Sequence, residues 1–201
     1  MPTVFTETPS RPVPLDPPRK RWTRAECAAL ESSGVLEQEN LELVEGELIS
    51  KMGKKRPHAN SAMLLAEWLV QIFGFRFVNQ EVPIDVAPED NPTNEPVPDV
   101  IVLTQESQNF RSANPRPEDL RLVVEIANTS LTFDLGTKAA LYARAGIAEY
   151  WVLDVTGRRL LVHRDAKAGS YASIIAYGEH ESVAPLAAPH AEFRVADAFP
   201  A

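Results

Sequence analysis

The sequence is poor in cysteine, and what it lacks narrows the class of protein. Cys27 is the single cysteine among 201 residues, so the chain cannot form an internal disulfide, and no other cysteine or histidine stands near it at metal-ligand spacing. No stretch approaches the run of about 20 apolar residues that a membrane helix requires. The first 18 residues hold six prolines and no apolar segment, unlike a secretory signal peptide. These absences predict a soluble, cytoplasmic protein.

Basic residues are also in short supply. The chain has 20 lysines and arginines against 28 aspartates and glutamates, a formal net charge of -8, whereas proteins that bind nucleic-acid phosphates usually carry a basic excess. The charge is unevenly distributed, because five glutamates lie within residues 37–47 and are followed at once by Lys51, Lys54, Lys55 and Arg56. The two clusters are either a metal site flanked by a phosphate-contacting edge or a solvated loop of mixed charge.

Length and composition fit one folded domain preceded by a tail. A chain with 44% hydrophobic and 24% charged residues resembles an average globular protein of this length. Residues 1–21 are too rich in proline for a helix or a strand, and we expect this disordered tail to be dispensable for folding. Residues 22–201 are expected to form a single domain.

Within this domain the hydrophobic period changes from helical to strand-like and back. A capping box at Thr23 and Glu26 begins a short helix, and residues 41–52 alternate as a strand or a hairpin. Residues 57–73 have the period of a second helix. We predict a third helix over residues 132–145 and strands at residues 75–77, 82–86, 99–103, 120–126, 149–154, 160–163 and 171–176. The order of elements predicts a mixed α/β sheet flanked by helices.

Two carboxylates stand at the ends of apolar strands. Asp99 opens one strand and Glu125 lies near the end of another, where an unpartnered acid costs several kcal/mol. Mg²⁺ typically takes one or two carboxylates together with water and phosphate oxygens, so it is the simplest partner, with Mn²⁺ as a substitute. Without the cation the two acids are expected to repel each other, and at least one is expected to have a raised pKa.

Lys138 lies inside the third predicted helix. If its ammonium group faces the same cavity, it could orient or help to deprotonate an attacking water and neutralise the charge that develops on phosphorus. The alternative is an ordinary surface salt bridge with Asp134, four residues earlier on the helix. For Asp99 the alternative is a turn started by Pro98. The sequence leaves both alternatives open.

Several short motifs resemble one known family. They are Leu41-Glu42-Leu43-Val44-Glu45-Gly46-Glu47-Leu48, His58, Pro98-Asp99-Val100, Leu122-Val123-Val124-Glu125-Ile126, Ser130, Asp134, Lys138, Tyr142-Ala143-Arg144-Ala145-Gly146-Ile147 and Glu149-Tyr150-Trp151-Val152-Leu153-Asp154. In this order they resemble the Uma-type putative restriction endonucleases of the PD-(D/E)XK nuclease superfamily. The resemblance implies a restriction-endonuclease-like fold, with a mixed sheet of four or five strands between helices, and Mg²⁺-dependent cleavage of DNA.

The same resemblance implies roles for the central residues. Asp99 and Glu125 correspond to the two metal carboxylates of the superfamily. Lys138 corresponds to a catalytic lysine displaced onto the next helix, because Ala127 stands where the superfamily pattern places its lysine.

Three further residues are implied to belong to the site. Glu42 resembles an acid of the N-terminal element that assists the metal, and His58 and Tyr142 resemble residues that line the substrate cleft. Taken by themselves, these residues also fit a solvated strand glutamate, a histidine at a helix start and a half-buried tyrosine.

Two functions follow from these residues. In the first, the protein is an endonuclease in which Asp99, Glu125 and the backbone carbonyl of Ile126 hold Mg²⁺, while Lys138 positions the water that attacks DNA. In the second, it is a catalytically inactive binding or interaction protein that kept the nuclease fold. No base-reading motif predicts a target sequence. We expect a homodimer, with residues 149–154 as a self-complementary edge strand.

Overall fold

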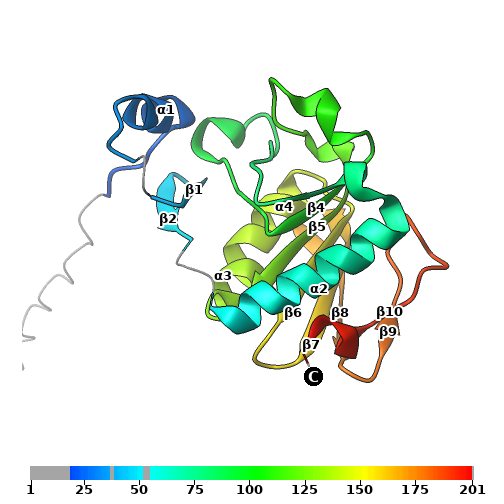
Figure 1. Ribbon diagram of the computed structural model, residues 1–201. Coiled ribbons are helices and arrows are strands. Elements are labelled where there is room, and N and C mark those ends of the chain that lie inside the picture. The colour runs from blue at the N-terminus through cyan, green and yellow to red at the C-terminus, as the bar shows by residue number, and fades with distance from the viewer. Residues whose placement is uncertain (1–18, 37–38, 52–54, 201) are drawn as a thin grey trace, which may run out of the picture.

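A six-stranded mixed sheet is the centre of the fold (Figure 1). The computed structural model describes residues 19–36, 39–51 and 55–200. In spatial order the strands are β3 (Val78–Gln80), β4 (Val100–Leu103), β5 (Leu120–Ala127), β6 (Glu149–Asp154), β7 (Arg159–Lys167) and β8 (Ser170–Gly178). The predicted mixed α/β sheet is confirmed, and it is wider than the four or five strands that the resemblance implies.

The direction of each strand follows from its connection. β5 and β6 run parallel, and the chain between them crosses over through a helix, as a parallel connection requires. The other neighbouring strands of this sheet are antiparallel. The helix of this crossover begins at Leu131, shortly after β5 ends at Ala127.

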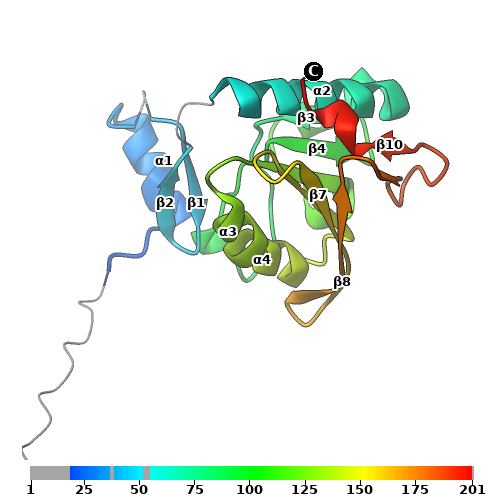
Figure 2. The same ribbon diagram turned by 90° about the horizontal axis from the view of Figure 1, so that it is seen from below.

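Helices cover both faces of the sheet (Figure 2). Helix α2 (Arg56–Phe73) packs on one face, where it buries Val102 and Val124. Helix α4 (Ala139–Arg144) covers the other face, which buries Ile101 and Val123. Successive side chains of a strand point to opposite faces, so the apolar runs of β4 and β5 supply two cores at once.

The third predicted helix is continuous but irregular. It begins as α3 (Leu131–Phe133), widens into a π-helical turn at Asp134–Lys138, and continues as α4. Gly146, with a φ of 75°, follows its last turn, which is the left-handed conformation that favours glycine at a helix C-terminus.

The N-terminal elements lie beside the sheet (Figure 1). Helix α1 (Arg24–Ser32) has the predicted capping box between Thr23 and Glu26. The segment predicted as a strand or a hairpin is a hairpin of β1 (Leu41–Val44) and β2 (Glu47–Ser50). Its turn has positive φ at Glu45 and Gly46. A backbone bridge from β1 to Glu95 ties the hairpin to the loop before β4.

Two predicted strands are wrong. Residues 75–77 form a 3₁₀ turn after Gly74, whose φ of 93° ends α2. Residues 82–86 join no ladder, because Pro83 has no N–H to donate. The remaining described elements are short: 3₁₀ turns Asn91–Thr93, Ser107–Phe110, Pro117–Asp119 and Val195–Ala198, and the pair β9 (Ser182–Val183) and β10 (Phe193–Arg194).

Strand β6 cannot be a free edge. It pairs with β5 on one side and with β7 on the other, and all six of its residues are buried. The edge strand proposed for a homodimer at residues 149–154 is therefore wrong, because those backbone groups are already used.

The described residues cover only part of the predicted tail and of the basic cluster. Residues 1–18 of the predicted tail and Lys54 of the basic cluster lie outside the described residues. Arg21, at the end of the predicted tail, is described and lies 3.3 Å from Glu47 in an ion pair. Across residues 19–36, 39–51 and 55–200, no helix is long and apolar enough to cross a membrane.

Candidate functional site

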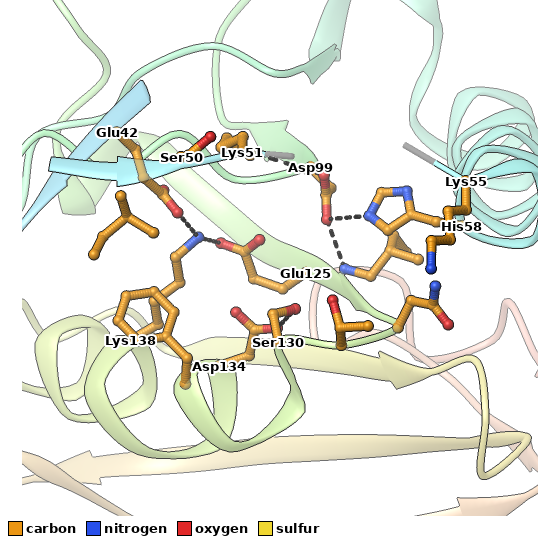
Figure 3. A pocket seen from close by; sticks show the side chains of 15 residues that line it. Glu42, Ser50, Lys51, Lys55, His58, Asp99, Glu125, Ser130, Asp134 and Lys138 are labelled. Carbon is orange, nitrogen blue, oxygen red and sulfur yellow. Dashed lines mark hydrogen bonds and ion pairs between the residues drawn. The ribbon is translucent and has the colours of Figure 1, made fainter. Parts of the chain in front are cut away.

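A cavity of about 190 Å³ lies where the β1–β2 hairpin, the start of α2, the ends of β4 and β5 and the π-helical turn meet (Figure 3). Of the seven predicted site residues, six line it, and Tyr142 does not. Among the described residues, eight ionisable side chains line it: Glu42, Lys51, Lys55, His58, Asp99, Glu125, Asp134 and Lys138. The fold thus gathers groups that are far apart in the sequence.

Asp99 enters the cavity just before β4, next to the end of β5. Its Oδ2 accepts a hydrogen bond from the backbone N–H of Ile126 at 2.7 Å and lies 3.4 Å from Nε2 of His58. Its Oδ1 lies 3.7 Å from Nζ of Lys51. Burial alone would raise the pKa of Asp99, but the His58 hydrogen bond and the Lys51 charge lower it well below its usual range. Asp99 is therefore held as a carboxylate.

Glu125 points from the middle of the sheet toward the π-helical turn. Its Oε1 accepts hydrogen bonds from Lys138 at 2.8 Å and from the hydroxyl of Tyr142 at 2.9 Å. Burial raises the pKa of Glu125 to about 8, against the pull of Lys138 and with help from the nearby Asp99 and Asp134 charges. This is the acid with a raised pKa that the sequence predicts.

Lys138 joins two carboxylates in the wall of the cavity (Figure 3). Its Nζ lies 2.9 Å from Glu42 and 2.8 Å from Glu125, and its side chain is 2% exposed. Burial lowers the pKa of Lys138, but the surrounding carboxylates outweigh burial and raise it above its usual range. The alternative of a surface pair with Asp134 is wrong, because Lys138 is buried and its hydrogen-bonded partner is Glu125.

Glu42 and Tyr142 support this pair from two sides. Glu42 is buried, and its Oε2 accepts a hydrogen bond from the backbone N–H of Val97 at 3.0 Å, which fixes the carboxylate that faces Lys138. Tyr142 is fully buried and lies behind Glu125. Its position allows it to orient Glu125 rather than to touch a substrate in the cavity.

The π-helical turn determines which side chains of this helix face the cavity. Its wider turn leaves both Asp134 and Lys138 buried on the cavity side. Asp134 accepts a hydrogen bond from the hydroxyl of Ser130 at 2.6 Å. Burial raises the pKa of Asp134, against the opposing effects of Lys138 and Ser130.

The donors present fit a hard divalent cation. Asp99 and Glu125 offer carboxylate oxygens to one cavity, and burial raises the pKa of Glu125. A nearby cation would restore the ionised form. The described residues contain no cluster of three or more acidic, histidine or cysteine side chains arranged as a metal site. Two carboxylates are enough for Mg²⁺, which keeps several waters.

Reasoning from the sequence gave no role in the site to several described residues that line the cavity, among them Lys51, Lys55, Ser130 and Asp134. Lys51 and Lys55 appeared only in a basic cluster with two possible interpretations, Ser130 only as part of the family motifs, and Asp134 in those motifs and as an alternative surface partner of Lys138. For the two lysines the signal was present, since they follow the acidic hairpin directly. Nothing local to the sequence shows that Lys51 lies beside Asp99.

We expect the metal-free protein to lose stability as the pH rises from about 4.5 to about 8. Over this window Glu125 gives up its proton in the unfolded chain but keeps it in the folded protein. The native state then binds more protons than the unfolded state, so the free energy of unfolding falls with rising pH. Urea unfolding in EDTA across this window measures the effect, and Mg²⁺ should offset part of the loss. A flat profile would contradict the buried, uncompensated carboxyl group.

Comparisons with known proteins bear on the family and the fold of the chain. A family model described as "Putative restriction endonuclease" (Uma2) matches residues 25–196. The solved structure of a putative nuclease of the DUF820 family from Anabaena variabilis is similar, with a TM-score of 0.61 and 15% sequence identity over 81% of this chain and 90% of that chain. At this identity the likeness shows the fold alone. No curated protein matches the chain significantly.

Proposed function

Because the chain belongs to the Uma2 family of putative restriction endonucleases, we propose that it is a Mg²⁺-dependent endonuclease that hydrolyses phosphodiester bonds in DNA. The observation that carries the proposal is the meeting of Asp99, Glu125 and Lys138 in one cavity. The two acids would hold the cation, and the ammonium group would hold the attacking water. Mn²⁺ has the same preference for oxygen ligands and is expected to substitute.

Each residue has a role that its contacts support. Asp99, Glu125 and the backbone carbonyl of Ile126 would hold the cation. When bound, the cation activates water and stabilises negative charge on the phosphate oxygens. The N–H of Ile126 fixes Asp99, and the hydroxyl of Tyr142 fixes Glu125.

Lys138 is placed to hold the attacking water. An ammonium group has three N–H donors, and Glu42 and Glu125 face two of them. The third is left for a water in the cavity, which Lys138 lines. Glu42 fixes the ammonium group, and His58 steadies Asp99.

Two broader expectations belong to the same proposal. A DNA substrate agrees with the cytoplasmic location predicted from the sequence. A homodimer would place two sites on one duplex, and its contact surface must differ from β6, which is internal to the sheet.

We expect the wild-type protein to nick supercoiled plasmid DNA in Mg²⁺ or Mn²⁺ and to stop when EDTA is added, because cleavage needs the cation held by the two acids. Agarose gels that follow the loss of the supercoiled form measure the rate. Asp99→Asn, purified in the same way, is the matched control for contaminating nucleases. If wild type and control nick at the same trace rate, the catalytic proposal fails and an inactive, DNA-binding or protein-binding role takes its place.

A further inference from the structure

Apart from the metal ion, the proposed site has no protein cation assigned to the phosphate, and Lys138 does not readily supply one. Lys138 lies between two carboxylates and is 2% exposed, so its positive charge is already balanced. Its remaining N–H is assigned above to the water. A phosphodiester that enters the cavity brings a further negative charge beside Asp99 and Glu125, and a cationic side chain that faces it adds to the stabilisation that the metal ion gives.

Lys51 stands on a different wall of the cavity from Lys138 (Figure 3). It directly follows β2, its side chain is 12% exposed, and its ammonium group donates a hydrogen bond to the backbone carbonyl of Val97. The same ammonium lies 3.7 Å from Oδ1 of Asp99, beyond the usual N–H···O range. Lys51 is therefore held at the mouth of the acidic site by one backbone contact and a longer ion pair.

Two further side chains line the cavity near Lys51, and one of them is a lysine. Lys55 and His58 line the same cavity from the start of α2, and Lys55 is exposed. The carboxylates and Lys138 lie deeper, and each of these side chains is 5% exposed or less. A negatively charged backbone approaching from solvent would thus meet lysines before it meets acids, although the chain as a whole carries a net charge of -8.

We infer that Lys51 is a further substrate-contacting residue, whose ammonium group binds a non-bridging oxygen of the phosphodiester that is cut. The inference rests on the proposed function and refines it. Lys51 and Lys55, the two described lysines of the basic cluster that line the cavity, then form the phosphate-contacting edge of the acidic site. Lys138 serves the water and Lys51 the phosphate.

Lys51→Gln tests the inference, because the amide can still donate to Val97 but carries no charge. The probe is a short fluorescein-labelled DNA duplex of mixed sequence, titrated in a fixed concentration of Ca²⁺ to limit cutting while KCl is varied. We expect the slope of log Kd against log salt concentration to fall by about 0.9, the loss of one phosphate contact. Plasmid cleavage in Mg²⁺ should slow by about a hundredfold.

Two variants separate the phosphate contact from a structural role. Lys51→Arg keeps the charge and should keep the wild-type salt slope. Lys167→Gln removes an exposed lysine at the end of β7, which does not line the cavity, and should also leave the slope unchanged. If Lys51→Gln is unstable by circular dichroism, Lys51→Met takes its place, because it also removes the charge, and a wild-type salt slope in that variant overturns the role of Lys51.

The outcomes distinguish this inference from the proposed function. An unchanged salt slope in folded Lys51→Gln, or a slope lowered equally by Lys51→Arg, overturns the role of Lys51 even if wild type cuts DNA. A wild type that binds the duplex but does not cut plasmid contradicts the nuclease, while the slopes still decide whether Lys51 contacts phosphate. A wild type that does not bind DNA overturns both.

Discussion

Glu125→Gln is expected to abolish cleavage and at the same time to raise the stability of the metal-free protein at pH 8 by roughly 1 to 3 kcal/mol. Cleavage is lost because the amide no longer offers a carboxylate to the cation. Stability rises because burial raises the pKa of Glu125 to about 8, so the folded protein holds this group charged only at a cost. The substitution removes the charge at nearly constant volume.

The contacts around Glu125 survive this substitution. Lys138 and the hydroxyl of Tyr142 both donate to Oε1, and an amide oxygen can accept both bonds. Lys138 also keeps Glu42 as its partner at 2.9 Å, so no buried ammonium group is left alone. Urea unfolding in EDTA at pH 8 and below pH 4.5 measures the difference, which should vanish at the lower pH, where Glu125 is protonated in both states.

Asp99→Asn is the matched comparison, and its effect on stability should have the opposite sign. It should also abolish cleavage, since the second carboxylate is lost. The pKa of Asp99 is lowered, because His58 and Lys51 favour its ionised form in the folded protein. Above its ordinary pKa the carboxylate therefore contributes stability, which the amide loses. If both substitutions change the free energy of unfolding by the same amount and in the same direction, the pKa of Glu125 is not raised while that of Asp99 is lowered, and this interpretation is wrong.

The sequence predicts the presence of these acids but not the difference between them. Glu125 stands between Val124 and Ile126, so its burial could be predicted from its own neighbours in the chain. The charge state of Asp99 depends on Lys51 and His58, which come from the hairpin and from α2. Only the tertiary fold brings Lys51 and His58 to Asp99, and no local sequence pattern indicates it.

The same distinction separates the predicted from the unpredicted parts of the fold. Hydrophobic periodicity and capping residues predict the helices α1 and α2 and the apolar strands β4 and β5. The π-helical turn Asp134–Lys138 is a single-turn change in hydrogen bonding, and the three- and four-residue spacing of the helix hides it. The apolar run of β6 already indicated burial on both faces, so reading it as an edge overlooked a signal that the sequence contained.

Lys138→Met is expected to lower the free energy of unfolding by about 3 to 5 kcal/mol, the range for removing one partner of a buried ion pair. Lys138 lies between Glu42 and Glu125, and all three side chains are almost fully buried. Methionine fills similar space but leaves the two carboxylates without a cation between them. They must then ionise against each other or take up protons, and either outcome costs stability. Cleavage should slow by about a hundredfold or more, because the water loses its ammonium donor.

Two controls separate this effect from a general loss of a lysine. Lys55→Met removes an exposed lysine of the same cavity and should change the free energy of unfolding by at most about 0.5 kcal/mol. Adding Glu42→Gln to Lys138→Met should recover part of the lost stability, because one of the two facing carboxylates is neutralised. Urea unfolding curves of the four proteins measure both effects. If Lys138→Met costs no more than about 0.5 kcal/mol, Lys138 behaves as a surface helix pair, and the buried carboxylate pair cannot be the centre of the site.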